Sequence, residues 1–245
     1  MDYNNTDIII ARATPIGKSA LAIIRLSGVN LISILTNFFP HKVLKPNFIT
    51  LCPIKKMNSN LVLDSCMVVY YKNPKSFTGE DMLEIFCHGN DVIVEEIINE
   101  FLIYGIRIAY PGEFSYRAFK NGKIDLLQAE SIAAKINQNS NQYGVALQNL
   151  ENGSTSKKLI LFRKKILNLQ SVIEHELDFN EEEITHMSIN QIKNNFKNIK
   201  EEINIILNWS LYLKVLDKGY KITILGLPNA GKSTLFNRIS GIDRA

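Results

Sequence analysis

Residues 81–105 read DMLEIFCHGNDVIVEEIINEFLIYG, and the pattern changes halfway along this stretch. Residues 81–89 form a short apolar run that ends at a glycine, which predicts a strand. From residue 91 the apolar side chains have helical spacing, and Gly105 follows them where a helix commonly ends. A strand that leads directly into a helix predicts a domain that mixes α and β structure.

Three other short apolar runs around this stretch predict strands. They are DIIIA (7–11), ALAIIRLSG (20–28) and SCMVVYY (65–71). The segment KNPKSFTGE that precedes residue 81 is rich in Pro, Ser, Thr and Gly, which predicts a loop. We therefore expect an α+β domain over residues 1–120.

The pattern becomes helical after residue 120. Helices are predicted over 124–150, 157–179 and 189–213, because apolar side chains recur there every three or four residues. The apolar seams of the second and third helices need cover from another helix. We expect an all-α region over 121–218, and poor solubility where these seams stay exposed.

The composition is that of an ordinary soluble chain, with 245 residues, 46% hydrophobic residues and a formal net charge of +4. This charge is compatible with a nucleic-acid partner but does not indicate one. The sequence shows no signal peptide and no apolar run long enough to span a membrane. Cys52, Cys66 and Cys87 form no CxxC pair, which favours a reducing compartment. We expect a cytoplasmic protein with no membrane partner.

Near the end of the sequence, residues 226–233 read GLPNAGKS and fit the phosphate-binding pattern G-x-x-x-x-G-K-[ST]. KITIL (221–225) before it predicts a strand, and STLFNRIS after it predicts a helix that ends at Gly241. In such a loop Lys232 reaches the phosphates of a nucleotide and the Ser233 hydroxyl binds Mg²⁺. The alternative is a glycine-rich turn between core elements. We expect the first strand, P-loop and helix of an α/β nucleotide-binding domain over 219–245.

Two charged residues lie on apolar strand faces. Arg25 lies on the same strand face as Leu21 and Ile23, and Glu84 lies on the same strand face as Met82 and Phe86. A charge on such a face is costly unless it is paired or binds a ligand. Two interpretations stay open, an ion pair between Arg25 and Glu84 or a ligand site that uses both.

Five stretches together resemble the MnmE (TrmE) family of tRNA modification GTPases. They are DIIIARATPIGKSALAIIRLSG (7–28), SFTGEDMLEIFCHG (76–89), RIAYPGEFSYRAFKNGKIDLLQAESIAAKI (107–136), ELDFNEEEI (176–184) and GLPNAGKSTLFNRISG (226–241). The resemblance implies a folate-binding domain that forms a homodimer, then a helical domain into which a GTPase domain is inserted. Local departures from the family pattern are PIGKS near residue 17 and Asn90 after Gly89.

The resemblance also implies the function of the whole protein. It would hydrolyse GTP and, in a heterotetramer with an MnmG-type FAD/NADH protein, add a carboxymethylaminomethyl-type group at C5 of the wobble uridine of certain tRNAs. The one-carbon donor would be 5-formyltetrahydrofolate or methylenetetrahydrofolate. This sequence has neither D-x-x-G nor N-K-x-D, so we expect the chain alone to be inactive as a GTPase. The alternatives are a non-catalytic folate-binding, dimerising fragment with a remnant P-loop, and an unrelated P-loop ATPase or kinase.

The resemblance assigns site residues by motif. Arg25, Glu84 and Lys123 would bind the folate, although Lys123 by itself, in the polar KNGK, is more typical of a solvated loop lysine. Asn229 would also bind K⁺, Ser233 would also bind Mg²⁺, and no catalytic residue falls within this chain. The residues that would bind GTP are Asn229, Ala230, Gly231, Lys232, Ser233 and Thr234.

Other polar groups are less specific. Cys87 and His88 are adjacent on a predicted strand, so they point to opposite faces and form no dyad. A core cysteine and a turn histidine are favoured there. The carboxylates of 180–184 indicate a solvated segment more than a metal site. The basic clusters 72–77 and 157–165 could contact tRNA, but they lack interleaved exposed aromatic residues and are more typical of a solvated surface.

Overall fold

A computed structural model of the chain describes residues 7–39, 43–56, 59, 61–137, 141–178, 189–218 and 222–241. The chain divides into two compact units, residues 1–132 and 133–245. Within the described residues, no helix is both long and apolar enough to cross a membrane. The three-domain division at residues 120 and 218 stays a prediction.

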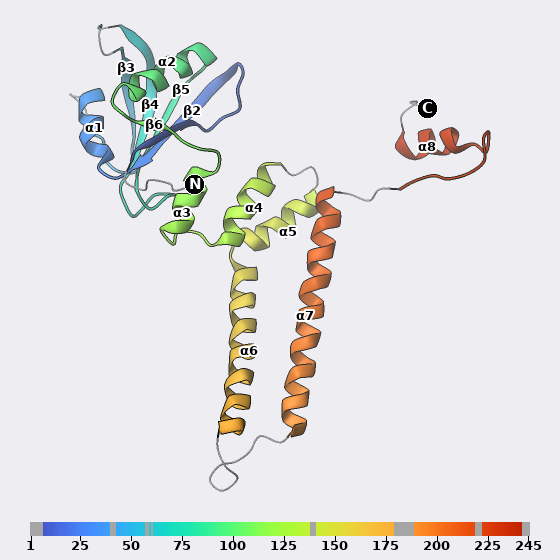
Figure 1. The fold of residues 1–245 in the computed structure, drawn as a ribbon. Coiled ribbons are helices and arrows are strands. Elements are labelled where there is room, and N and C mark those ends of the chain that lie inside the picture. The colour runs from blue at the N-terminus through green and yellow to red at the C-terminus, as the bar shows by residue number, and fades with distance from the viewer. Residues whose placement is uncertain are drawn as a thin grey trace. The chain divides into compact units, whose positions relative to one another are not determined.

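The first unit is built on a six-stranded sheet with the order β3-β4-β5-β2-β1-β6 (Figure 1). Neighbouring strands are antiparallel, except that β6 runs parallel to β1. Pro53 lies in β3, an edge strand, where a residue without an N–H is tolerated. The strands are β1 (Ile9–Arg12), β2 (Ser19–Gly28), β3 (Ile49–Lys55), β4 (Val62–Tyr71), β5 (Asp81–Gly89) and β6 (Arg107–Ile108).

One face of the sheet carries the hydrophobic core beneath helices α1 (Leu31–Phe38) and α2 (Asp91–Leu102). Alternate strand residues such as Ile24 and Ile85 are fully buried on this face, as the period of two in an extended strand requires. The rings of Phe38 and Phe101 stack with centroids 4.0 Å apart, which joins the two helices.

The opposite face of the sheet, here called the open face, carries the other set of alternate residues. Leu21, Ile49, Leu51 and Met67 are exposed there, although each is a large apolar side chain. The same face carries Arg25 and Glu84, which are register partners on β2 and β5. The open face is therefore an apolar surface with a charged pair inside it.

The second unit is helical, as the sequence predicted. The predicted helix over 124–150 is in fact two helices, α4 (Leu126–Ile136), which begins in the first unit, and α5 (Asn141–Glu151). The long helices α6 (Ser154–Asp178) and α7 (Ile189–Lys218) run side by side (Figure 1). On the predicted seams, Ile166 of α6 and Phe196 of α7 stay exposed, whereas Leu169 is buried, so the seams are covered only in part.

The predicted strand over 221–225 does not form. Residues 222–227 have no regular structure, and Lys221 lies outside the described residues. A strand needs a neighbour for its ladder of hydrogen bonds, and none of the described strands pairs with this segment. The helix after the P-loop does form, as α8 (Lys232–Ser240), and Gly241 ends it in a left-handed conformation.

The remaining predicted elements lie close to the observed ones. Strand β5 has the predicted limits, and β1, β2 and β4 differ from their predictions by three residues or fewer at either end. The structure also contains elements that were not predicted from the sequence, namely helices α1 and α3 (Glu113–Lys120) and strands β3 and β6. The segment 180–184 lies outside the described residues.

Candidate functional site

Arg25 and Glu84 form an ion pair on the open face. Nε of Arg25 lies 2.7 Å from Oε1 of Glu84, and the side chains are 42% and 14% exposed. The contact confirms that the two residues are close enough to pair. It does not use all the hydrogen-bonding capacity of the pair, so it leaves the ligand interpretation open.

The unused groups of this pair define what it can recognise. The Tyr71 hydroxyl lies 3.2 Å from Oε2 of Glu84, so each carboxylate oxygen receives one hydrogen bond. A carboxylate has about four acceptor positions, which leaves one on each oxygen. Arg25 contacts Glu84 through Nε, and its two Nη groups can still donate. The site therefore offers two free acceptor positions on the Glu84 carboxylate and the free Nη–H donors of Arg25, and apolar side chains surround both groups.

Lys123 lies in the turn after α3 and is held against the loop that precedes β5. Its Nζ donates to the carbonyl of Pro74 at 2.9 Å, and its backbone N–H donates to the carbonyl of Ala118 at 2.9 Å. Gly79 has a left-handed φ of 78°, and a Cβ there would lie 3.1 Å from Cγ of Lys123. Lys123 is exposed but tethered, unlike a freely solvated loop lysine.

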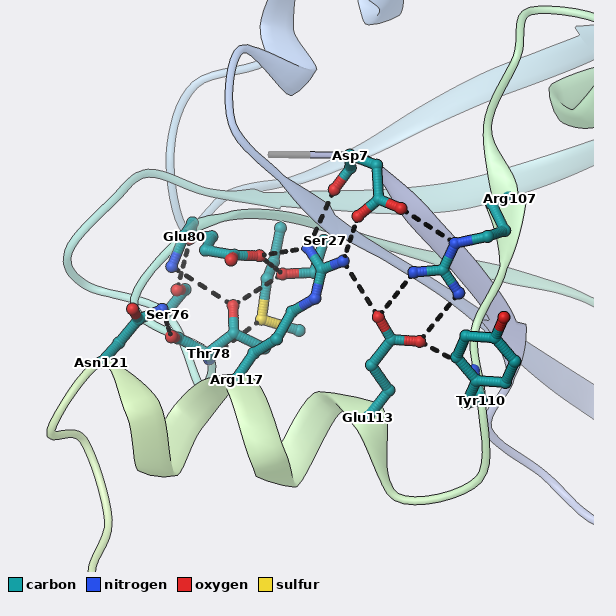
Figure 2. Close-up of polar contacts among 11 residues, drawn as sticks. Asp7, Ser27, Ser76, Thr78, Glu80, Arg107, Tyr110, Glu113, Arg117 and Asn121 are labelled. Atoms are coloured by element: carbon teal, nitrogen blue, oxygen red, sulfur yellow. Dashed lines mark hydrogen bonds and ion pairs between the residues drawn. The ribbon is translucent and has the colours of Figure 1, made fainter. Parts of the chain in front are cut away.

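A buried polar cluster fixes α3 to the sheet (Figure 2). At its centre is Arg117, whose side chain is 1% exposed. Its Nη2 contacts Asp7 at 2.6 Å and Glu113 at 3.0 Å, and its Nη1 contacts Glu80 at 3.2 Å. Of its nitrogens, Nε alone has no hydrogen-bond partner among the described residues. A guanidinium buried this deeply is stable only because these carboxylates surround it.

The same cluster extends to the loop beside Lys123. Glu80 accepts a hydrogen bond from Ser27 at 2.8 Å, and the hydroxyls of Ser27 and Thr78 lie 2.7 Å apart. The Thr78 carbonyl accepts from Asn121 at 2.7 Å. The contact between Asn121 and Thr78 thus ties the 72–80 loop to the turn that follows α3 (Figure 2).

Sequence reasoning assigned no role to this cluster. Its members are spread over residues 7–121, and their chain spacing carries no periodic signal. The available signal was charge within short motifs, namely Glu80 in SFTGED and Glu113 and Arg117 in GEFSYR. Glu113 and Arg117 are four residues apart, which places them on one face of a helix, but the helix itself was not predicted.

The cysteines lie in the core and His88 lies apart from them. Burial raises the pKa of Cys87 to about 11, and Cys87 Sγ lies 3.5 Å from the Ala22 carbonyl. His88 is 69% exposed at its side chain and its Nδ1 lies 2.8 Å from Oδ1 of Asp64. The predicted absence of a Cys/His dyad is confirmed. His88 is the penultimate residue of β5 and not a turn residue.

Of the strand, loop and helix predicted around the P-loop, the described residues form a turn at 228–230 and helix α8, but no strand. Asn229 and Gly231 both have left-handed φ angles, 62° and 77°, and Lys232 begins α8 directly after them. Nζ of Lys232 lies 2.7 Å from the Leu227 carbonyl and 3.1 Å from the Gly226 carbonyl. The lysine thus folds back over its own loop. Of the clusters that the described residues form, none has three or more His, Cys, Asp or Glu side chains placed to hold a metal ion.

Two family profiles match adjoining parts of the chain. The profile described as the N-terminus of the GTP-binding protein TrmE matches residues 8–123, and the profile of the MnmE helical domain matches residues 126–243. Together they cover nearly the whole chain, and their junction lies just after Lys123.

Curated relatives are similar to the chain along almost its full length. A protein of Legionella pneumophila (strain Corby) is 41% identical over 243 residues, which is 98% of this chain and 53% of the relative. Proteins of Francisella philomiragia and Chlorobium chlorochromatii are 38% and 36% identical, over 98% and 97% of this chain and 52% and 51% of each relative. All three are named tRNA modification GTPase MnmE. The chain spans about half the length of these relatives.

Proposed function

This chain belongs to the MnmE family of tRNA modification GTPases, and on that premise we propose that its sheet domain binds a tetrahydrofolate one-carbon donor. Arg25, Glu84 and Lys123 are the proposed ligand residues. The donor is 5-formyltetrahydrofolate or methylenetetrahydrofolate. A protein with the full length of these relatives is proposed to hydrolyse GTP and to modify the wobble uridine of certain tRNAs at C5.

The observation that carries this proposal is the unused hydrogen-bonding capacity of Arg25 and Glu84 on an exposed apolar face. A pterin ring is flat and presents two neighbouring N–H groups, which match the two free acceptors of a carboxylate. The ring faces are apolar and suit a surface lined by aliphatic side chains. The Nη groups of Arg25 can donate hydrogen bonds to carbonyl groups of the ligand, and the positive charge of Lys123 can pair with its negatively charged glutamate tail.

The open face also supports the proposed homodimer. Exposed Leu21, Ile49, Leu51 and Met67 form more apolar surface than a monomeric sheet usually leaves in water. A second copy of the domain would bury these side chains and exclude water from the ligand. The MnmG-type FAD/NADH partner and the carboxymethylaminomethyl chemistry are proposed from the family alone.

The P-loop is proposed as the nucleotide site of the GTPase. In this role Lys232 leaves its contacts with the loop carbonyls and reaches the phosphates, while Ser233 contributes a Mg²⁺ ligand. Asn229 is the proposed K⁺ ligand. Backbone N–H groups of Ala230 and Gly231, and the first turn of α8 through Thr234, would surround the phosphates with positive dipoles.

Isothermal titration of the chain with 5-formyltetrahydrofolate tests the folate proposal. We expect Glu84→Ala to weaken binding at least tenfold, and Glu95→Ala, an exposed glutamate of α2, to leave it unchanged. Equal affinities for wild type and Glu84→Ala would remove Glu84 from the site. Absence of binding by the wild type would overturn the proposal.

A further inference from the structure

We infer that Tyr71 is a positioning residue of the folate site, because its hydroxyl orients the Glu84 carboxylate toward the ligand. The inference rests on the proposed function. It adds a residue that lies outside the three assigned by motif. Tyr71 is the last residue of β4, next to β5 in the sheet.

The sheet register brings Tyr71 within reach of Glu84. Tyr71 lies opposite Met82 on β5, and Glu84 is two residues further along the same strand and on the same face. Diagonal neighbours of this kind are close enough for a long side chain to contact. The hydroxyl of Tyr71 and Oε2 of Glu84 are 3.2 Å apart.

Two donors then hold the carboxylate from different strands. Nε of Arg25 on β2 donates to Oε1 at 2.7 Å, and the Tyr71 hydroxyl on β4 donates to Oε2. The terminal torsion of a glutamate is otherwise soft, so its carboxylate plane has no strong preferred orientation. With one donor on each oxygen, rotation of the plane breaks at least one hydrogen bond. The two free acceptor positions therefore keep a fixed direction.

The tyrosine stays a donor at neutral pH. Burial, followed by the charge of Glu84, raises the pKa of the Tyr71 hydroxyl above its ordinary value. A ligand that brings two parallel N–H groups needs both acceptors aligned at once, so a loosened carboxylate binds it less well. Removal of the hydroxyl should thus weaken binding through Glu84 and not through a direct contact.

The test is a double-mutant cycle read by isothermal titration with 5-formyltetrahydrofolate. We expect Tyr71→Phe to weaken binding by about three- to tenfold, the range that corresponds to one hydrogen bond. In a Glu84→Ala background, which has no side-chain acceptor for the Tyr71 hydroxyl, the same substitution should change affinity less than twofold. Tyr70→Phe is the matched control, because Tyr70 is its buried neighbour on the opposite face, and it should bind like the wild type. Thermal unfolding checks that each variant is folded.

Each outcome decides the inference. Wild-type affinity in a folded Tyr71→Phe variant, with weak binding by Glu84→Ala, would overturn the role of Tyr71 and leave the proposed function intact. An equal loss in both backgrounds would show that Tyr71 acts independently of Glu84, which also overturns it. Failure of the wild type to bind folate would remove the proposed function and this inference together.

Discussion

Arg25 and Glu84 lie opposite each other on β2 and β5, with Nε of Arg25 2.7 Å from Oε1 of Glu84. An ion pair and a ligand site are usually treated as alternatives for two charges on an apolar face. Here the geometry permits both, because the pair engages one nitrogen and one oxygen. The pair keeps the charges compensated in the free protein and leaves its outer groups available to a ligand.

Replacement of Arg25 should separate stability from binding. Arg25→Gln should lower the free energy of unfolding by no more than about 1 kcal/mol, because the Arg25 side chain is 42% exposed and water screens its charge. Folate affinity should fall at least tenfold in the same variant. Urea unfolding and titration measure the two effects, with the exposed Arg163→Gln of α6 as the control. A large loss of stability without loss of affinity would assign Arg25 a structural role.

Replacement of Arg117, in contrast to Arg25, should cause a large loss of stability. Arg117→Leu leaves Asp7, Glu80 and Glu113 without their common partner in a buried site, so it should cost about 3–5 kcal/mol of stability. Lys120→Leu, on the exposed side of the same helix, should change stability by about 0.5 kcal/mol or less. Urea unfolding followed by tyrosine near-ultraviolet circular dichroism measures the loss, while Trp209 fluorescence reports α7 separately. Equal stability of the two variants would contradict the prediction.

The same cluster should make the fold sensitive to acid. For Asp7 and Glu113 burial acts to raise the pKa, but hydrogen bonds from Arg107 and Arg117 outweigh it, so both pKa values are lowered. A carboxylate with a lowered pKa contributes stability that is present above its unfolded value, about 4, and is lost as the pH falls through its folded value. The free energy of unfolding should therefore decrease as the pH falls below about 4.5.

The variant Arg107→Met tests whether the acid sensitivity comes from the lowered pKa values of Asp7 and Glu113. The variant removes one source of the lowered pKa values, so its stability should depend less steeply on pH below about 4.5 than that of the wild type. Urea unfolding at several pH values between about 3 and 7 gives the slope of unfolding free energy against pH for the wild type and for the variant. Parallel slopes would show that the acid sensitivity comes from other carboxylates.

How much of this organisation the sequence predicted depends on the kind of contact involved. Strands β2 and β5 and helix α2 were predictable because apolar periodicity follows directly from local geometry. Glu84 and Arg25 stood out because they interrupt that periodicity. Helix α3 was missed because two of its buried residues are charged, Glu113 and Arg117, so its inward face does not look apolar.

The strand predicted at 221–225, which does not form, shows a different limit of prediction from local sequence. Its residues have strand propensity, but a strand forms only when another strand supplies hydrogen bonds, and propensity does not report on such a neighbour. The role of Tyr71 is also invisible to local patterns, because it depends on the register between β4 and β5. Long-range pairing is the information that the sequence pattern lacks.

The three cysteines should be unreactive in the folded chain. Cys52, Cys66 and Cys87 are buried, and burial raises the pKa of the Cys66 and Cys87 thiols, the latter to about 11. The thiolate is the reactive form, so little of it is present at pH 8. Ellman's reagent should modify almost no thiol in the native chain and all three after unfolding in guanidinium. Rapid modification of one thiol in native conditions would show a local opening of the core.

The P-loop should not turn over GTP in this chain alone. Lys232 lies on the carbonyls of Gly226 and Leu227, and the segment that precedes it has no strand structure to hold the loop. Hydrolysis also needs groups that orient the attacking water and complete the Mg²⁺ shell, and the sequence of this chain contains no D-x-x-G segment that would supply them. We expect phosphate release from GTP, with Mg²⁺ and K⁺ present, to equal that of Lys232→Ala. Potassium-stimulated turnover that Lys232→Ala abolishes would instead show that residues 219–245 form a working nucleotide site.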